Sequence, residues 1–165
     1  MEETIVAPAT PAGRGGISVV RISGKGAKEV GLSLCGELPG SWSFKPCSIL
    51  DGAGVLIDSG LVVFFGAPRS YTGEDVVEIH CHGNPVIVDS VVGASIFFGA
   101  RVAEPGEFTK RAFLNEKIDL TQAESVADLI AAQTTSALVA AQSSLSGEFS
   151  RLINKTIDKV MAARV

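Results

Sequence analysis

The pattern of this sequence changes from strand signals to helix signals at Pro105, and that change limits which folds the chain can adopt. Short runs rich in β-branched residues come before it, separated by Gly, Pro and Ser: TIVAPA, GISVVRIS, LVVFF, DVVEIHCH and ARVA. Helices are predicted between these runs at Ala27–Leu34 and Val86–Phe98. The part up to about Ala103 is therefore predicted to be an α+β domain, in which helices flank a mixed β-sheet.

Beyond Pro105 the pattern predicts helices only. Glu107–Leu114 follows a Pro-Gly start. Thr121, with Glu124 three residues later, has the spacing of a capping box that opens a helix through Ile130. This second part is therefore predicted to be all-α.

The last predicted helix, from about Thr134 to the end, carries a long apolar stripe. Its members recur at intervals of three, four, five or seven residues: Leu138, Leu145, Phe149, Leu152, Ile157, Val160 and Met161. The helix before it is too short to cover this stripe, and no Gly, Asn or Pro stop signal closes the pattern. We therefore expect a chain cut within a larger helical domain, with self-association through the stripe as the alternative.

The composition is that of a packed globular protein, with 46% hydrophobic and 19% charged residues among 165. The net charge of -4 argues against a broad phosphate-binding face, so any nucleic-acid contact is expected to be local or shared with a partner. No apolar run is long enough to span a membrane, and the acidic N-terminus is unlike a signal peptide, so we expect a cytoplasmic protein without a membrane partner. The three cysteines lack Cys-x-x-Cys spacing and are expected to be reduced, mostly buried thiols.

A carboxylate and two histidines stand in the run DVVEIHCH. Period-2 alternation places Val76, Glu78, His80 and His82 on one face of this strand, opposite Val77, Ile79 and Cys81. Glu78 either faces solvent, as glutamates usually do, or pairs with a donor such as a guanidinium or a ligand amide. The two histidines lack an identifiable third ligand, so a zinc site is not expected.

Arg21 interrupts an otherwise apolar row, with Ile17 and Val19 on the same face of its strand. Such an arginine either lies at a sheet edge with its head in water or anchors an anionic or carbonyl-bearing ligand, and the sequence does not decide between these alternatives. The glycines before this strand lack the spacing of a dinucleotide or phosphate loop. The sequence also has no recognisable nucleophilic triad.

Three long segments, taken in order, resemble the N-terminal portion of the MnmE/TrmE family of tRNA modification GTPases. They read TIVAPATPAGRGGISVVRISG, SYTGEDVVEIHCHGNP and EPGEFTKRAFLNEKIDLTQAESVADLI. Their order and spacing are similar to those of the family, and the resemblance covers essentially the whole chain.

The resemblance implies a tetrahydrofolate-binding and dimerisation domain at 1–118, similar in fold to the folate domain of aminomethyltransferases. The first helices of an incomplete helical domain follow at 119–165, and the family inserts its GTPase domain into that domain. The implied cofactor is a one-carbon folate, 5-formyl- or methylene-tetrahydrofolate, near a homodimer interface. In the family, the full protein and a flavin-containing partner called MnmG modify the wobble uridine of tRNA, and GTP, Mg²⁺ and K⁺ belong to the full-length protein only.

By the same resemblance, the folate contacts fall on Arg21, Glu78 and Lys117. The carboxylate of Glu78 suits the amide N–H and exocyclic amine of a pterin, because it can accept both hydrogen bonds. Arg21 and Lys117 suit the anionic glutamyl tail or the ring carbonyl, and which residue serves which group stays open. Lys110 and Arg111 are expected to form a solvated helix face. No catalytic residue and no metal ligand is assigned.

The chain departs from the family pattern after Gly83, where Asn84 replaces a usual second glycine, so the turn before the next helix can differ. It also has no phosphate loop and no C-terminal Cys-x-Gly-Lys, so we expect neither GTP hydrolysis nor unaided tRNA modification. Two other interpretations stay open. One is a stand-alone folate-dependent one-carbon transferase with His80 or His82 as general acid or base, and the other is a dimerisation scaffold without a ligand.

Overall fold

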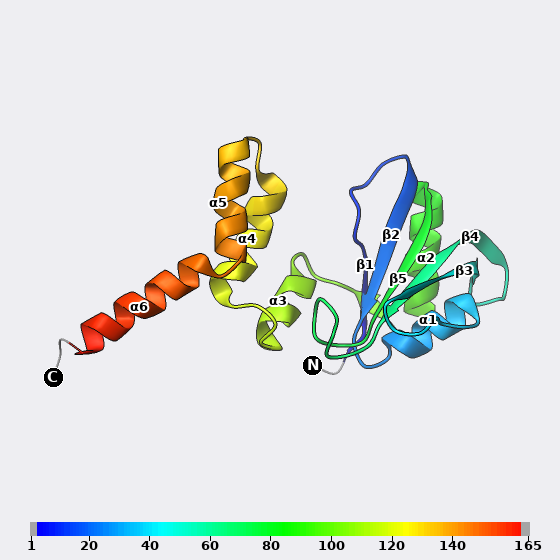
Figure 1. The fold of residues 1–165 in the computed structure, drawn as a ribbon. Coiled ribbons are helices and arrows are strands. Elements are labelled where there is room, and N and C mark those ends of the chain that lie inside the picture. Colours follow the sequence, from blue (N-terminus) through cyan, green and yellow to red (C-terminus); the bar gives the residue numbers. More distant parts are fainter. Residues whose placement is uncertain (1–2, 163–165) are drawn as a thin grey trace. The chain divides into compact units, whose positions relative to one another are not determined.

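The computed structural model describes residues 3–162, except for the side chains of Phe149 and Asn154. The chain forms two compact units, Met1–Phe108 and Thr109–Val165 (Figure 1). Every strand that the structure describes belongs to the first unit, so the predicted change of architecture after the sheet is confirmed. The domain boundary predicted after residue 118 stays a prediction.

Six strands form the sheet of the first unit, in the order β3-β4-β5-β2-β1-β6. Neighbouring strands are antiparallel except β1 and β6, which run parallel, so the sheet is mixed as predicted. The strands are β1 (Ile5–Pro8), β2 (Gly15–Ser23), β3 (Ser43–Leu50), β4 (Leu56–Phe65), β5 (Val76–Gly83) and β6 (Arg101–Val102).

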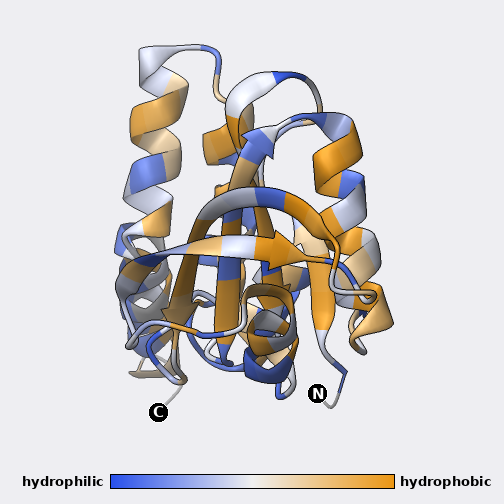
Figure 2. Ribbon diagram, turned by 90° about the vertical axis from the view of Figure 1, so that its right-hand side faces the viewer, coloured by the Kyte–Doolittle hydropathy of each residue, from blue (hydrophilic) through white to orange (hydrophobic). Residues whose placement is uncertain are grey.

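Two helices, α1 (Ala27–Cys35) and α2 (Pro85–Phe97), cover one face of this sheet and match their predicted ranges to within one residue at each end. Apolar side chains of both helices pack with alternate residues of the strands in one core. The fully buried members of this core include Val20, Ile22, Leu34, Val77 and Ile79. Figure 2 shows the apolar character of the strands and of the helices beside them. Because strand side chains alternate, burial of one set determines which residues occupy the opposite face.

The sequence pattern does not predict β3. Its residues, SFKPCSIL, include Pro46, which lacks the N–H group that a sheet ladder normally uses. β3 pairs with β4 alone and forms an edge of the sheet, where proline is tolerated.

Asn84 begins α2 with an extended backbone, φ -122° and ψ 125°. Its side chain accepts a hydrogen bond from the Val86 N–H at 2.9 Å. Pro85 occupies the first turn, where a helix does not need its N–H. The turn before α2 therefore forms without left-handed geometry at Asn84.

Among the described residues, four helices follow the sheet along the chain: α3 (Glu107–Leu114), α4 (Leu120–Ala131), α5 (Thr135–Leu145) and α6 (Glu148–Ala162). α3 has its predicted bounds. The capping box predicted for α4 at Thr121 and Glu124 is wrong, because Asp119 and Gln122 form it instead. The Gln122 N–H donates to Asp119 Oδ1 at 2.8 Å, and Gln122 Oε1 accepts from the Asp119 N–H at 2.9 Å. None of the described helices is long and apolar enough to cross a membrane.

The prediction of one continuous last helix is wrong, because Gly147 interrupts it. α5 ends at Leu145 and α6 begins at Glu148. Gly147 has φ 78°, a left-handed conformation that favours glycine at helix ends. The predicted stripe is therefore divided between two helices, and the side chain of Phe149 lies outside the described residues. Its exposed members on α6 are Leu152, Ile157, Val160 and Met161.

Candidate ligand-binding site

The second face of the sheet, opposite α1 and α2, carries the polar residues that the sequence singles out. Arg21, Glu78 and His80 alternate along β2 and β5 with core residues such as Ile22 and Ile79. Since β2 and β5 are interior strands, these side chains lie in the middle of the sheet. The interpretation of Arg21 as a sheet-edge residue is therefore wrong.

Arg21 and Glu78 form an ion pair across β2 and β5. They are register partners, and Arg21 Nε and Nη2 lie 2.8 and 2.7 Å from the same oxygen, Glu78 Oε1. The side chains of Arg21 and Glu78 are only 26% and 16% exposed. Of the two alternatives for Glu78, pairing with a guanidinium is confirmed and a solvent-facing position is wrong.

This ion pair leaves hydrogen-bonding capacity unused. Both guanidinium contacts go to Oε1, and no described residue donates to Glu78 Oε2 or accepts from Arg21 Nη1. His80 Nε2 lies 3.7 Å from Oε2, too far for a hydrogen bond, and this buried atom has no hydrogen-bond partner in the described part of the chain. Shielded polar atoms are normally satisfied, so the arrangement is suited to a polar ligand.

Aromatic rings border this polar cluster. The Arg21 guanidinium carbon lies 5.3 Å from the ring centre of Tyr71 and 5.6 Å from that of Phe108, within cation–π range. Phe44 packs edge-on against the His80 ring, with 5.6 Å between ring centres. The rings restrict the orientation of Arg21 and His80 and lower the dielectric around them, which strengthens their electrostatic interactions.

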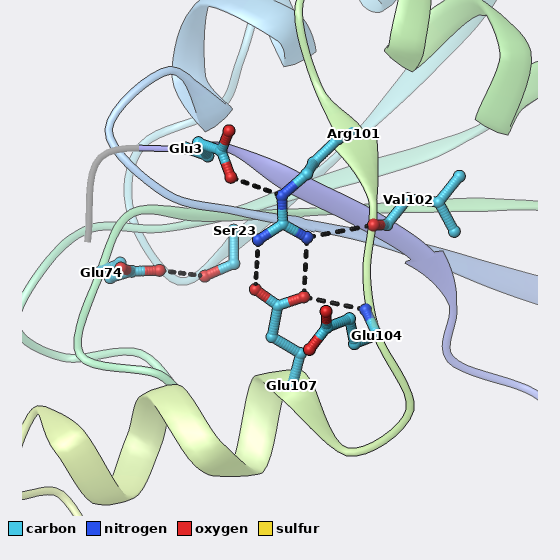
Figure 3. Close-up of polar contacts among 7 residues, drawn as sticks. All are labelled: Glu3, Ser23, Glu74, Arg101, Val102, Glu104 and Glu107. Carbon is cyan, nitrogen blue, oxygen red and sulfur yellow. Dashed lines mark hydrogen bonds and ion pairs between the residues drawn. The ribbon is translucent and has the colours of Figure 1, made fainter.

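A hydroxyl cluster holds the segment that carries Tyr71. Ser23 Oγ lies 2.7 Å from Thr72 Oγ1 and donates to Glu74 Oε2 at 2.9 Å, the latter contact being drawn in Figure 3. Ser23 and Thr72 are both fully buried. These bonds tie the loop between β4 and β5 to the end of β2, and Tyr71 is thereby held beside Arg21.

A second polar network anchors the start of α3, and with it Phe108. Arg101 of β6 donates from Nη1 and Nη2 to the two carboxylate oxygens of Glu107, at 2.8 and 2.7 Å (Figure 3). Its Nε donates to Glu3 at 2.6 Å, and the Glu104 N–H donates to Glu107 Oε2 at 2.8 Å. Hydrogen bonds to Glu107 and then to Glu3 raise the pKa of Arg101, so the guanidinium stays charged.

Residues 4–117, which include all of these strands, match the model of a family described as "GTP-binding protein TrmE N-terminus". The chain belongs to this family. The resemblance found in the three sequence segments is thereby confirmed. Arg21, Glu78 and Lys117 all lie within the part of the chain that matches the TrmE family.

Proteins named tRNA modification GTPase MnmE are similar to almost the whole chain. The one from Neisseria meningitidis serogroup B is 50% identical over 162 residues, which are 98% of this chain and 36% of that protein. The one from Legionella pneumophila is 49% identical over 166 residues, 99% of this chain and 37% of that protein. The one from Nitrosomonas eutropha is 48% identical over 163 residues, with coverages of 99% and 36%. The chain thus spans little more than a third of the length of these TrmE-family relatives.

Lys117, the third residue implied by the TrmE-family resemblance, lies in the second unit just after α3. Its N–H donates to the Ala112 C=O at 2.9 Å, and contact of its exposed side chain with a ligand stays a prediction. Lys110 is exposed as expected, but Arg111 is fully buried, so a solvated face for both residues is wrong. The reason is helical spacing, since Phe108, Arg111 and Ala112 follow the i, i+3, i+4 pattern of one face.

His82 ends the row of second-face residues on β5 and pairs with Asp58 of β4. The His82 N–H donates to Asp58 Oδ2 at 2.8 Å, and His82 Nδ1 lies 2.9 Å from Oδ1. Burial raises the pKa of Asp58, but hydrogen bonds from His82 and Ser59 outweigh it and hold that pKa below its usual value. Within residues 3–162, no group of three or more His, Cys, Asp or Glu side chains could hold a metal ion.

Sequence reasoning missed Tyr71 and Phe108 as residues of this site. The available signals were an aromatic residue inside the polar segment SYTGED and another directly before the basic residues of α3. An isolated aromatic residue is more often part of a core than a neighbour of a binding arginine. Only the folded chain brings both rings to Arg21.

Proposed function

We propose that this chain binds a one-carbon tetrahydrofolate on the second face of its sheet, through Arg21, Glu78 and Lys117. The observation that carries the proposal is Glu78 Oε2, an oxygen of a mostly buried side chain to which no described residue donates. A pterin presents an amide N–H beside an exocyclic amine, and a carboxylate can accept a hydrogen bond from each. Glu78 is therefore assigned to the pterin end of the ligand.

Arg21 supports the proposal because its Nη1 takes no part in the ion pair with Glu78, which uses Nε and Nη2. This group can donate to the ring carbonyl or to a carboxylate of the glutamyl tail, and Lys117 would serve the other. Tyr71 and Phe108 keep the guanidinium in place for this contact. When bound, 5-formyl- or methylene-tetrahydrofolate would supply its one-carbon unit.

Family membership supports a wider proposal for the complete protein. Since its relatives are named tRNA modification GTPases, we infer that the complete protein modifies the wobble uridine of tRNA in the cytoplasm, together with an MnmG-like flavoprotein. GTP, Mg²⁺ and K⁺ would bind a GTPase domain and not this chain, whose sequence has no phosphate loop.

We also propose that the chain forms a homodimer through its first unit. Three large apolar residues, Ile17, Phe44 and Leu61, are exposed on strands β2, β3 and β4. Exposed apolar residues gathered on one sheet are typical of protein contact surfaces. A second copy of the chain is the partner that this proposal assigns to them.

One observation favours a second candidate function, a stand-alone folate-dependent transferase. His80 Nε2 is buried without a partner among the described residues, 3.7 Å from Glu78 Oε2, and an imidazole in that setting can act as a general acid or base. Transferase activity that survives in the double variant His80→Ala, His82→Ala would exclude this role.

The first experiment is isothermal titration of the chain with 5-formyltetrahydrofolate, repeated on Glu78→Ala and on a control, Glu29→Ala. Glu29 is an exposed carboxylate of α1, on the other side of the sheet. We expect saturable binding by the parent and by Glu29→Ala, and binding at least about 10-fold weaker in Glu78→Ala, because a charged hydrogen-bond acceptor is lost.

Absence of binding by a folded parent would contradict the folate proposal. If sedimentation then shows a dimer, the chain is a dimerisation scaffold without this ligand. Equal weakening in Glu29→Ala and Glu78→Ala would also contradict the assignment of Glu78 to the site.

A further inference from the structure

His80 lies beside the residue that we assign to the pterin, two positions after Glu78 on the same face of β5. Its side chain is 23% exposed, and its Nε2 atom is buried without a hydrogen-bond partner in the described part of the chain. Glu78 Oε2 lies 3.7 Å from this nitrogen, about 0.8 Å beyond the usual length of a hydrogen bond. The two atoms are therefore close enough to pair after a small side-chain movement, but they are not paired in this structure.

Three neighbours of the His80 ring are apolar. Its register partners are Val19 of β2 and Leu61 of β4. Phe44 of β3 packs edge-on against the ring, with 5.6 Å between ring centres. None of these three side chains has a group that hydrogen-bonds to a ring nitrogen. They restrict the orientation of the ring without satisfying it.

Glu78 is the charged group to which His80 can respond. It stands 3.7 Å from the ring, whereas other charged side chains of the surrounding strands are already engaged in ion pairs. These pairs are Arg21 with Glu78, Asp58 with His82, and Lys45 with Glu37.

The carboxylate of Glu78 has a limited number of acceptor positions. Its two oxygens offer about four lone pairs in all. Arg21 Nε and Nη2 use two of them, both on Oε1. The amide N–H and the exocyclic amine of a pterin would need the two that remain, which lie on Oε2. A hydrogen bond from His80 to Oε2 would take one of the positions that the ligand needs.

The charge of the imidazole determines whether His80 makes this hydrogen bond. A neutral ring carries one proton, which can be on Nδ1 and leave Nε2 without a hydrogen. A protonated ring carries a hydrogen on both nitrogens, and its positive charge attracts the nearby carboxylate. Protonation would therefore draw His80 Nε2 and Glu78 Oε2 together, whereas a separation of 3.7 Å fits the neutral ring.

We propose that His80 is a pH-sensitive switch of the proposed folate site. The protonated ring hydrogen-bonds to Glu78 Oε2, and the neutral ring leaves that oxygen to the ligand. Histidine is the side chain that normally changes charge between about pH 5 and 8. The ligand therefore selects the neutral form and competes with a proton at His80. This inference rests on the proposed function and adds to it the regulation of the same site by pH.

The test is isothermal titration of the parent chain, His80→Gln and His80→Leu with 5-formyltetrahydrofolate at about pH 8 and about pH 6. Neither glutamine nor leucine changes charge in this range. We expect parent binding to weaken at least about 3-fold at the lower pH, and binding by each variant to change less than about 2-fold. Every other ionisable residue, His82 included, is the same in the three proteins, so a difference in pH dependence belongs to His80.

A second measurement uses the parent chain alone, so it does not depend on how a variant folds. If the ligand selects the neutral ring, binding at about pH 6 releases protons. Titrations at that pH in two buffers with different ionisation enthalpies should then give different heats of binding. The difference should fall to near zero at about pH 8.

The outcomes separate this inference from the folate proposal. Parent binding with the same pH dependence as His80→Gln, or binding at about pH 6 without proton release, would overturn the switch and leave the folate proposal intact. Absence of binding by the folded parent at both pH values would overturn the folate proposal, and the switch with it.

Discussion

The two faces of the sheet are built from the same strands, yet one face is apolar and buried whereas the other carries charged side chains. On the face covered by α1 and α2, residues such as Ile22 and Ile79 are fully buried among apolar neighbours. One position earlier on each strand, Arg21 and Glu78 carry charges and stay partly exposed. Burial of an aliphatic side chain stabilises the fold without regard to direction, whereas an ion pair adds little net stability but directs hydrogen bonds. The residues that stabilise the core and the residues that we propose to bind a ligand are thus one position apart along β2 and β5.

The largest difference between the faces is expected for loss of an aliphatic side chain. Ile79→Ala removes a fully buried side chain from the covered face and should lower the free energy of unfolding by about 2–5 kcal/mol. Ile17→Ala, the matched change at a residue of β2 that is 69% exposed in a single copy of the chain, should cost less than about 1 kcal/mol when both variants are compared at a chain concentration too low for the proposed dimer.

Urea unfolding followed by fluorescence measures both changes. Trp42 is the single tryptophan, and its ring centre lies 4.9 Å from that of Phe65 in the first unit, so its emission reports on the sheet. Similar losses of unfolding free energy in Ile79→Ala and Ile17→Ala would contradict the view that the covered face contributes most of the stability.

A smaller effect is expected when the ion pair is replaced by apolar residues. The double variant Arg21→Met, Glu78→Leu should stay within about 1 kcal/mol of the parent in its free energy of unfolding, because both charges are removed together. Glu78→Leu alone should be the less stable of the two, since it leaves the shielded Arg21 without its carboxylate. Urea unfolding measures the free energy of unfolding of the parent and of both variants. A double variant as unstable as Ile79→Ala would show that the ion pair contributes strongly to the stability of the fold.

The smallest effect is expected at the end of the second-face row, where Asp58 pairs with His82. The folded pKa of Asp58 lies below its ordinary value of 3.8, so its contribution to stability is present above that pH and is lost as the pH falls through the folded pKa. Asp58→Asn should therefore flatten the acid limb of a stability–pH curve by less than about 1 kcal/mol. An identical acid limb in parent and variant would show that this pair does not contribute.

Local signals were sufficient for many elements. The alternation in DVVEIHCH correctly predicts which residues of β5 point to each face, and α3 has its predicted bounds. Local signals were insufficient at the start of α4, where two pairs of residues have the spacing of a capping box. Asp119 with Gln122 and Thr121 with Glu124 both have capping-box spacing, and only the backbone of α4 selects the first. β3 was missed because proline argues against a strand unless its place at the sheet edge is known.

The sequence by itself determined the change from strands to helices after Pro105, the alternation along β2 and β5, and membership in the TrmE family, since each is carried by neighbouring residues or by long motifs. Only the tertiary structure decided that Arg21 meets Glu78, 57 residues away, through the register of two interior strands. It also decided that Tyr71 and Phe108 border that pair. The physical reason is that strand register and helix packing are selected by burial of the whole apolar core, which no local pattern records.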